Sequence, residues 1–194
     1  MESTITAPPH GGGRPLLHQK GAETQTFGTL EQLPIGFGHD TRRYACQRLN
    51  RVLADTQIRY SLYKKHHWLM RGAAFCSLHL MLDKHAKAQP ALVDAPAERI
   101  RSLGAVSVGD PRHGAELTSV PRTPDGVEPV PAMPSRLLDA HERILTDARD
   151  AAARISAEGD EGSTDLPVSD VIRTGEAQVR FLAEHLVATP LARG

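Results

Sequence analysis

AFCSLHLMLDKHAKAQPALVDAPAERIRSLG, residues 74–104, is the stretch of this 194-residue chain that decides the fold. Apolar residues recur through it at the spacing of one face of an amphipathic helix. Gly104 follows the last of them, in the position after a helix end where glycine is favoured. The recurring residues are Phe75, Leu78, Leu82, Leu92, Ile100 and Leu103. The sequence therefore predicts a long helix from about Ala74 to Leu103.

Three further segments share this helical period. One runs from about Thr41 to near Met70, before Gly72, and a second from roughly Pro134 to Ala157. The last is expected to be capped by Asp165 and to end near Val187. The predicted inner residues of the first of these segments are Cys46, Leu49, Leu53, Thr56, Tyr60, Tyr63 and His67. Those of the second are Leu138, His141, Leu145, Ala148, Ala152 and Ile155, and those of the last are Val168, Ile172, Val179, Leu182 and Leu186.

The connection over residues 104–133 contains five prolines and is long for a compact domain, so it is expected to cross the molecule. Asp110-Pro111 is a start signal for a short extra helix ending before Val120. The predicted fold is therefore all-α: two helical hairpins joined by one long crossover, the ferritin-like four-helix arrangement. Residues 39–188 form the bundle, 1–38 a flexible N-terminal tail and 189–194 a C-terminal tail.

Composition excludes several classes of protein. The 23 basic residues balance the 23 acidic ones, so the chain as a whole is not a polycation that seeks nucleic acid. The two cysteines have no metal-binding or redox spacing, which suits a reducing cytoplasm. No apolar run approaches the roughly 20 residues of a membrane span. A soluble cytoplasmic protein with no membrane partner is expected.

Four ionisable residues lie on one face of the helix predicted over 74–103. At about 100° per residue, His79, Asp83, Asp94 and Glu98 all fall within about 100° of one another. Charged groups on a buried stripe are costly unless they pair or bind a metal. Imidazoles with carboxylates suit iron, manganese or zinc, and the thiolates of a structural zinc site are missing from this set.

Helix geometry divides this set into two half-sites. Asp83 and Asp94 are about 16 Å apart along the axis, whereas metal–ligand bonds are about 2 Å long. One ion therefore cannot be held by both ends of the same helix. Two copies crossing about a two-fold axis would bring each half-site against its complement, which predicts a dimer with metal at the interface.

Lys65-His66-His67-Trp68, Gly72, Phe75, Leu78-His79, Asp83, Asp94 and Ala97-Glu98-Arg99 together resemble the Dps family (DNA-binding protein from starved cells) over residues 40–187. The intervals of 12, 4, 11 and 4 residues between His67, His79, Asp83, Asp94 and Glu98 match that family.

The resemblance implies a ferroxidase, an enzyme that oxidises Fe(II) to Fe(III) with hydrogen peroxide or oxygen. It also implies iron storage as a ferric mineral inside a dodecameric shell, and protection against oxidative stress. His67, His79 and Asp83 would come from one subunit, and Asp94 and Glu98 from its two-fold partner. Trp68 would be the family's oxidisable ring beside the first ligand.

Three departures from the family pattern leave an alternative open. Leu69 replaces the usual asparagine, and Pro90 and Pro96 interrupt the helix, where each proline costs on the order of 3 kcal/mol in a straight interior. The alternative is a nucleoid-associated DNA-binding protein with an impaired iron centre; a di-metal protein using manganese or zinc is a third interpretation. Arg42, Arg43, Arg48 and Arg51 form the basic patch for DNA, although a solvated helix face is favoured for them.

The remaining ionisable residues receive weaker interpretations. Asp160, Glu161, Asp165 and Asp170 fit either a helix N-terminus or the negative pore that the resemblance implies at a three-fold axis. His66 and His85 lie off the ligand face and are expected at the surface or behind the ligands. His141 has no predicted partner.

Overall fold

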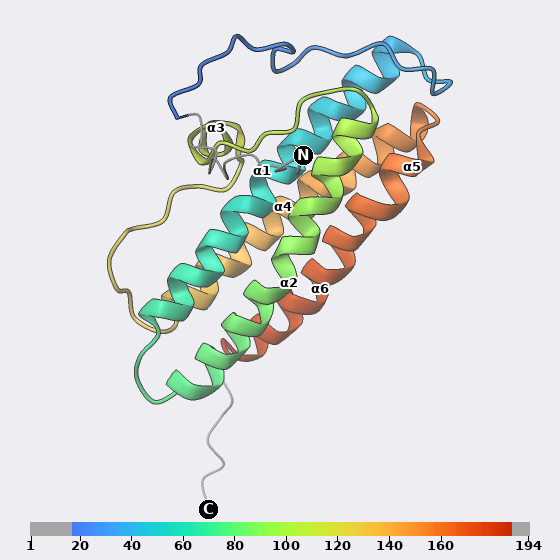
Figure 1. Ribbon diagram of the computed structural model, residues 1–194. Helices are drawn as coiled ribbons and strands as arrows, with labels where there is room; N and C mark the ends of the chain where they lie inside the picture. The colour runs from blue at the N-terminus through green and yellow to red at the C-terminus, as the bar shows by residue number, and fades with distance from the viewer. Residues whose placement is uncertain (1–16, 188–194) are drawn as a thin grey trace, which may run out of the picture.

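A computed structural model describes residues 17–187 of the chain and confirms an all-helical, ferritin-like fold (Figure 1). Its elements are α1 (His39–Leu69), α2 (Phe75–Ser102), α3 (Pro111–Leu117), α4 (Ala132–Ala157), α5 (Glu161–Ser163), the π-helical turn η1 (Thr164–Val168) and α6 (Ser169–Glu184). Within the described range there is no strand, and the single isolated bridge joins Leu30 to Ala105. The predicted tails lie partly outside this range, so the division into tails and bundle stays a prediction.

The four long helices form two hairpins packed side by side. α1 packs along α2, α4 packs along α6, and α1 also contacts α4 (Figure 1). The crossover between α2 and α4 runs along the bundle, and its short helix α3 packs against α1. The predicted order of two hairpins joined by a crossover with an extra helix is therefore confirmed.

The core lies between the four long helices and is largely aliphatic. Leu49 and Leu53 of α1 meet Leu82 and Ile100 of α2 in one fully buried cluster that also includes Leu137 and Ile144 of α4. Burial of each such side chain contributes about 1.5–3 kcal/mol, so this cluster dominates the folding free energy. None of the helices within residues 17–187 combines the length and apolar character needed to cross a bilayer.

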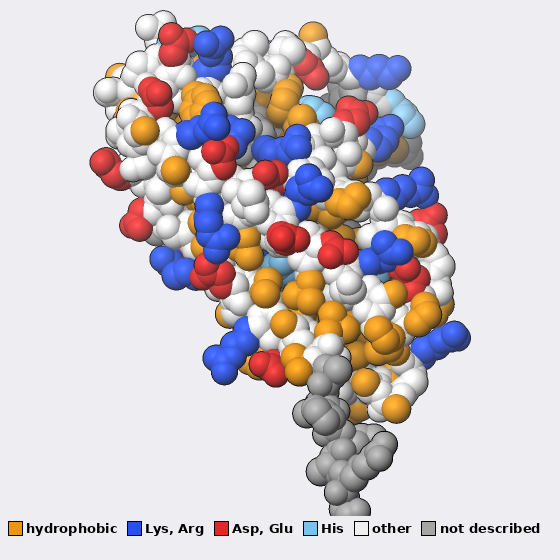
Figure 2. Space-filling view, turned by 180° about the vertical axis from the view of Figure 1, so that it is seen from behind, with side chains coloured by type: hydrophobic (Ala, Val, Ile, Leu, Met, Phe, Trp, Pro, Cys, Tyr) orange, Lys and Arg blue, Asp and Glu red, His pale blue; other side chains and the backbone are white. Residues whose placement is uncertain are grey.

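The space-filling view shows basic and acidic side chains interspersed over much of one face, and hydrophobic side chains gathered at the end where the described chain stops (Figure 2). Exposed apolar residues at this end include Phe181 and Val187. Together with Leu80 of α2, Phe181 lines a groove of about 580 Å³ between α2 and α6.

Two helix ends follow their predicted signals. Gly104 ends α2 with a φ of +90°, and a Cβ there would come within 2.9 Å of the Glu31 carbonyl oxygen, so only glycine fits. The Asp110 side chain caps α3 by accepting a hydrogen bond from the Arg112 backbone N–H, with Pro111 in the first turn.

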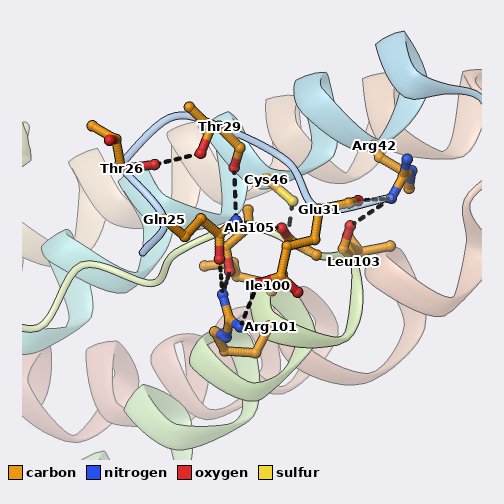
Figure 3. Close-up of polar contacts among 11 residues, drawn as sticks. Gln25, Thr26, Thr29, Glu31, Arg42, Cys46, Ile100, Arg101, Leu103 and Ala105 are labelled. Atoms are coloured by element: carbon orange, nitrogen blue, oxygen red, sulfur yellow. Dashed lines mark hydrogen bonds and ion pairs between the residues drawn. The ribbon is translucent and has the colours of Figure 1, made fainter. Parts of the chain in front are cut away.

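The segment before α1 is held against the end of α2 (Figure 3). The Gln25 amide donates to the Gly104 carbonyl at 2.8 Å, and Arg42 of α1 donates to the carbonyls of Glu31 and Leu103. Arg101 of α2 donates to the Gln25 side-chain oxygen at 2.8 Å. Residues 25–31 therefore lie in specific contact with the body of the protein, although no helix precedes His39 in the described range.

The predicted start of the last helix is wrong. Asp160, rather than Asp165, is the capping residue: its side chain accepts from the Ser163 N–H at the start of α5. The chain then passes through η1 into α6, and Asp165 lies exposed in that turn. Val168 and Leu182 are fully buried and Ile172 packs against the core, as predicted, whereas Leu186 is exposed. Val171, Gly175 and Gln178 are additional buried positions of α6.

α2 continues through both of its prolines. Pro90 is exposed, whereas Pro96 is buried. Beyond Pro96, the Ser107 hydroxyl donates to the Ala97 carbonyl at 2.6 Å and the Ser102 hydroxyl donates to the Glu98 carbonyl at 2.9 Å. These side-chain donors supply additional hydrogen bonds to backbone carbonyls near the C-terminal end of the helix.

Asp55 ties the crossover to α1. This buried carboxylate accepts hydrogen bonds from the Thr118 hydroxyl and the Ser119 N–H, each at 2.6 Å, and from the Ser119 hydroxyl at 3.0 Å. Burial nevertheless raises the pKa of Asp55 above its ordinary value. The folded protein therefore holds this proton to a higher pH than the unfolded chain does.

Asp55→Asn should become more stable relative to the wild type as pH rises. The stability contributed by the protonated carboxyl is complete below the unfolded pKa of about 4 and is lost as pH rises through the higher folded value. The asparagine keeps a neutral side chain throughout. Urea unfolding between about pH 3.5 and 7 measures this difference, with Asp125→Asn at an exposed ion pair as the control. A constant difference across that range would contradict it.

Candidate metal centre

His67 and His79 join the end of α1 to the start of α2 through two matching hydrogen bonds. His67 Nδ1 lies 3.0 Å from the His79 carbonyl oxygen, and His79 Nδ1 lies 3.0 Å from the His67 carbonyl oxygen. The two rings stack with centroids 3.8 Å apart. A carbonyl only accepts, so each Nδ1 carries a proton, and in the neutral form of each ring Nε2 keeps its lone pair.

Asp83 lies one turn of α2 after His79. Its Oδ1 is 4.0 Å from His67 Nε2, so Asp83 lies near the stacked histidines, although the three side chains do not form a metal-binding cluster within the described chain. Phe75 stacks on the outer side of the His79 ring, with centroids 4.8 Å apart. Trp68 is 69% exposed, with the Lys64 ammonium 5.9 Å from its ring.

Two lysines hold the Asp83 carboxylate. Lys87 Nζ lies 2.6 Å from Oδ2, and Lys64 Nζ lies 3.2 Å from Oδ1. Hydrogen bonds from Lys87 and then Lys64 lower the pKa of Asp83 to about 2. The carboxylate is therefore ionised at any physiological pH, and an incoming cation competes with two ammonium groups for it.

Asp94 and Glu98 lie further along α2, and both are exposed. Neither reaches the first half-site, as expected from the length of helix between them. Among residues 17–187 of one chain, no three His, Cys, Asp or Glu side chains gather closely enough to hold an ion. Geometry thus keeps the two predicted half-sites apart within a chain.

The residue after Glu98 anchors this end of α2. Arg99 donates to Asp160 at 2.7 Å and to the Ser163 hydroxyl at 2.9 Å. Asp160 is buried, and Gly162 leaves room for the guanidinium, since a Cβ there would lie 3.0 Å from it. Arg99 therefore fixes the turn that carries Glu98 against α5.

Several sequence interpretations change. His66 and His85 are buried rather than at the surface, and burial lowers the pKa of each to about 4. Two of the acidic residues proposed for a pore are already paired with arginines. The buried Asp160 pairs with Arg99, and Asp170 pairs with Arg173. The pore itself stays a prediction.

The basic patch is also smaller than the sequence indicates. Arg42 is buried against backbone carbonyls, Arg43 pairs with Asp40, and Arg48 pairs with Asp150. This leaves Arg51 as the member of the patch with neither an ion pair nor a side-chain hydrogen bond in the described structure. The favoured interpretation, a solvated helix face, fits Arg43 and Arg51 but is wrong for Arg42.

Comparison with known proteins agrees with this geometry. The model of the ferritin-like domain family matches residues 46–192. DpsC from Streptomyces coelicolor superposes with a TM-score of 0.85 at 62% identity, over 89% of this chain and 100% of that one. The chain belongs to the Dps group of the ferritin-like family.

Two curated relatives of this Dps chain differ in how similar they are to it. A protein encoded in the bpoA2 5′ region of Kitasatospora aureofaciens is 63% identical over 76% of this chain and 98% of its own length. The nutrient stress-induced DNA-binding protein of a Synechococcus strain is 32% identical over 78% of this chain and 86% of its own. The resemblance first suggested by the histidine and carboxylate intervals is thus confirmed at the level of family and fold.

Sequence reasoning missed the lysines around Asp83 in this Dps chain. Lys87 stands four residues after Asp83 on one helix, a spacing that pairs opposite charges, so this contact was detectable. Lys64 comes from α1, and nothing in the sequence indicates which turn of α2 it faces.

Lys87→Gln should strengthen the binding of divalent metal at Asp83. Lys87 is 75% exposed, so its ion pair is of the weak surface kind. Its removal is expected to tighten Zn(II) or Fe(II) binding about 1.5- to 5-fold, measured by anaerobic calorimetry. Lys84→Gln removes the same charge from an exposed position of α2 that makes no ion pair to Asp83 in the described structure. Equal affinities in the two variants would show that only overall charge matters.

Proposed function

We propose that this Dps protein is a ferroxidase and iron-storage protein. It oxidises Fe(II) with hydrogen peroxide or oxygen at sites shared between two chains, and it stores the ferric product in a dodecameric shell. In this proposal the bundle comprises residues 39–188, and residues 25–31 of the segment before it pack against the end of α2. Iron is the substrate and the cargo. The protection of the cell from peroxide follows from the consumption of both reactants.

One observation carries the proposal: the reciprocal bonding of His67 and His79. Because each Nδ1–H is held by a carbonyl, each imidazole presents Nε2 as a ligand without any change of tautomer. Asp83 Oδ1 lies 4.0 Å from one of these nitrogens. Two imidazoles with an ionised carboxylate form a donor set that suits Fe(II).

The exposed carboxylates complete the proposed centre. Asp94 and Glu98 are on the surface, free to meet a second chain, and they add the hard oxygen ligands that favour Fe(III). Two Fe(II) ions, one peroxide molecule and two protons give two Fe(III) ions and two water molecules. Paired iron therefore reduces peroxide without releasing hydroxyl radical.

Mixing two inactive variants tests both the activity and its division between chains. His79→Ala/Asp83→Ala removes one half-site, and Asp94→Ala/Glu98→Ala removes the other. Each variant alone should lose Fe(II) oxidation by peroxide, followed by ferric absorbance. When they are unfolded together and reassembled, random pairing restores about a quarter of the wild-type number of complete sites.

Two outcomes would contradict the proposal. Wild-type rates in either single variant would exclude these residues from the reaction. No recovery in the mixture would exclude the shared site, provided that a mixture of wild type with the first variant, reassembled in the same way, regains activity.

DNA binding is the second candidate, and it rests on the name of the Synechococcus relative. The described structure offers few basic side chains of the patch for contacts with DNA phosphates, because Arg42 and Arg48 are engaged in internal contacts. We expect plasmid DNA to be retarded at low salt at most, with a shallow salt dependence that reflects few phosphate contacts. A gel shift that survives about 0.2 M salt and is lost in Arg43→Gln/Arg51→Gln would establish DNA as a partner.

A further inference from the structure

The groove of about 580 Å³ between α2 and α6 is a second place where this protein can bind a molecule. The two helices run antiparallel (Figure 1) and contact each other only sparsely. Small side chains line the gap, namely Ala88 on α2 and Thr174 and Ala177 on α6. Side chains of this size do not fill the space between helices that the rest of the bundle holds apart. The sequence of α2 and α6 therefore leaves the groove open.

Large apolar side chains stand at the edges of the groove, where solvent reaches them. Leu80 of α2 is 62% exposed, Phe181 of α6 is 55% exposed, and Met81 adds to the lining. His85 supports the Phe181 ring in an edge-on contact, with centroids 6.0 Å apart. Apolar surface that is held open to water in this way is unfavourable, and it is typical of a surface that binds a partner or ligand.

One lysine borders the groove, and no aspartate or glutamate of the described chain lines it. This lysine is Lys84. Lys64 and Lys87 pair with Asp83, whereas Lys84 has no ion pair within the described structure. The hydrocarbon part of a lysine packs well along an apolar wall while its ammonium group stays at the edge. The groove thus combines an apolar body with one free positive charge.

The uncharged polar groups of the groove are largely occupied within the protein. The Gln178 side-chain oxygen accepts hydrogen bonds from the Tyr63 hydroxyl at 3.3 Å and the Gln89 amide at 3.2 Å. The Ser77 hydroxyl donates to a backbone carbonyl one turn earlier at 3.1 Å. The polar end of a ligand is therefore held by the Lys84 ammonium, and the rest of the ligand meets apolar surface.

We propose that this groove binds a free fatty acid of medium chain length. Its carboxylate pairs with Lys84, and its chain runs between Leu80 and Phe181 toward Ser77. Lys84 and Ser77 are about 10 Å apart along α2, a span that the extended chain of decanoate matches.

The chemistry of a single fatty acid fits the groove in three respects. One negative charge matches the one free lysine. One chain fits a groove of about 580 Å³, the size of a site for one small ligand, whereas the two chains of a membrane lipid do not. The site is also separate from the candidate metal centre, because Asp83 faces Lys64 of α1 and the groove lies against α6.

Decanoate brominated at its last carbon tests the site and the direction of the chain. In crystals of the full-length protein soaked with this probe, an anomalous bromine peak should lie between α2 and α6 on the Ser77 side of Leu80. The carboxylate density should reach Lys84. Ala177→Phe fills the groove from an exposed position of α6 and should abolish the peak.

Calorimetry with unmodified fatty acids measures the same contacts in solution. Octanoate should bind about 4- to 15-fold more weakly than decanoate, because two methylene groups leave the apolar surface. Lys84→Gln should weaken decanoate binding about 1.5- to 5-fold, as expected for an exposed ion pair. Lys87→Gln is the matched loss of a lysine from the same helix; because Lys87 faces Asp83, this variant should bind decanoate like the wild type.

Two kinds of result overturn the proposal. One is a wild-type crystal without a bromine peak in the groove, including a crystal in which a second copy of the chain fills it. The other is an affinity for fatty acids that does not change with chain length or that is equal in the wild type and Ala177→Phe. Lys84 and Ala177 are both exposed, so the two variants leave the core intact. None of these measurements depends on iron oxidation.

Discussion

The paired hydrogen bonds between His67 and His79 are the interaction on which the candidate centre depends. They join the last turn of α1 to the first turns of α2, so they fix how the first hairpin closes. The same bonds fix the tautomer of both rings. A single contact thus couples the geometry of the fold to the availability of two metal-binding nitrogens.

Most of the fold was predictable because its determinants are local. The three- and four-residue periods place the four long helices, Gly104 ends α2, and Asp110-Pro111 starts α3. The start of the last helix was not predictable, because Asp160 acts as a cap in partnership with Arg99 from another helix. The packing of residues 25–31 against α2 has the same character: it depends on Gln25 and Arg101, which are far apart in the chain.

The candidate site was likewise predictable in its local features and not in its contacts between helices. The intervals that select the five predicted ligands are a property of one sequence stretch. In the structure His67 contacts His79 and lies 4.0 Å from Asp83, and the role of these residues as ligands stays a prediction. The sequence could not reveal contacts between helices, such as the ion pair of Lys64 with Asp83 and the hydrogen bond between Tyr63 and His141. It also did not reveal that His66 is buried. Arg59 shows the limit most clearly, because this fully buried side chain is not among the inward positions predicted for the first helix.

Pro90 and Pro96 raise the cost of α2 without interrupting it, and the anchoring of Arg99 restrains the turn that carries Glu98. The separation of the two half-sites along this one helix has a consequence for biogenesis. In the proposed shared site, a newly made chain would lack a complete set of iron ligands until it met a second copy. Redox chemistry would then begin only after assembly, when the product can be enclosed rather than released among the contents of the cell.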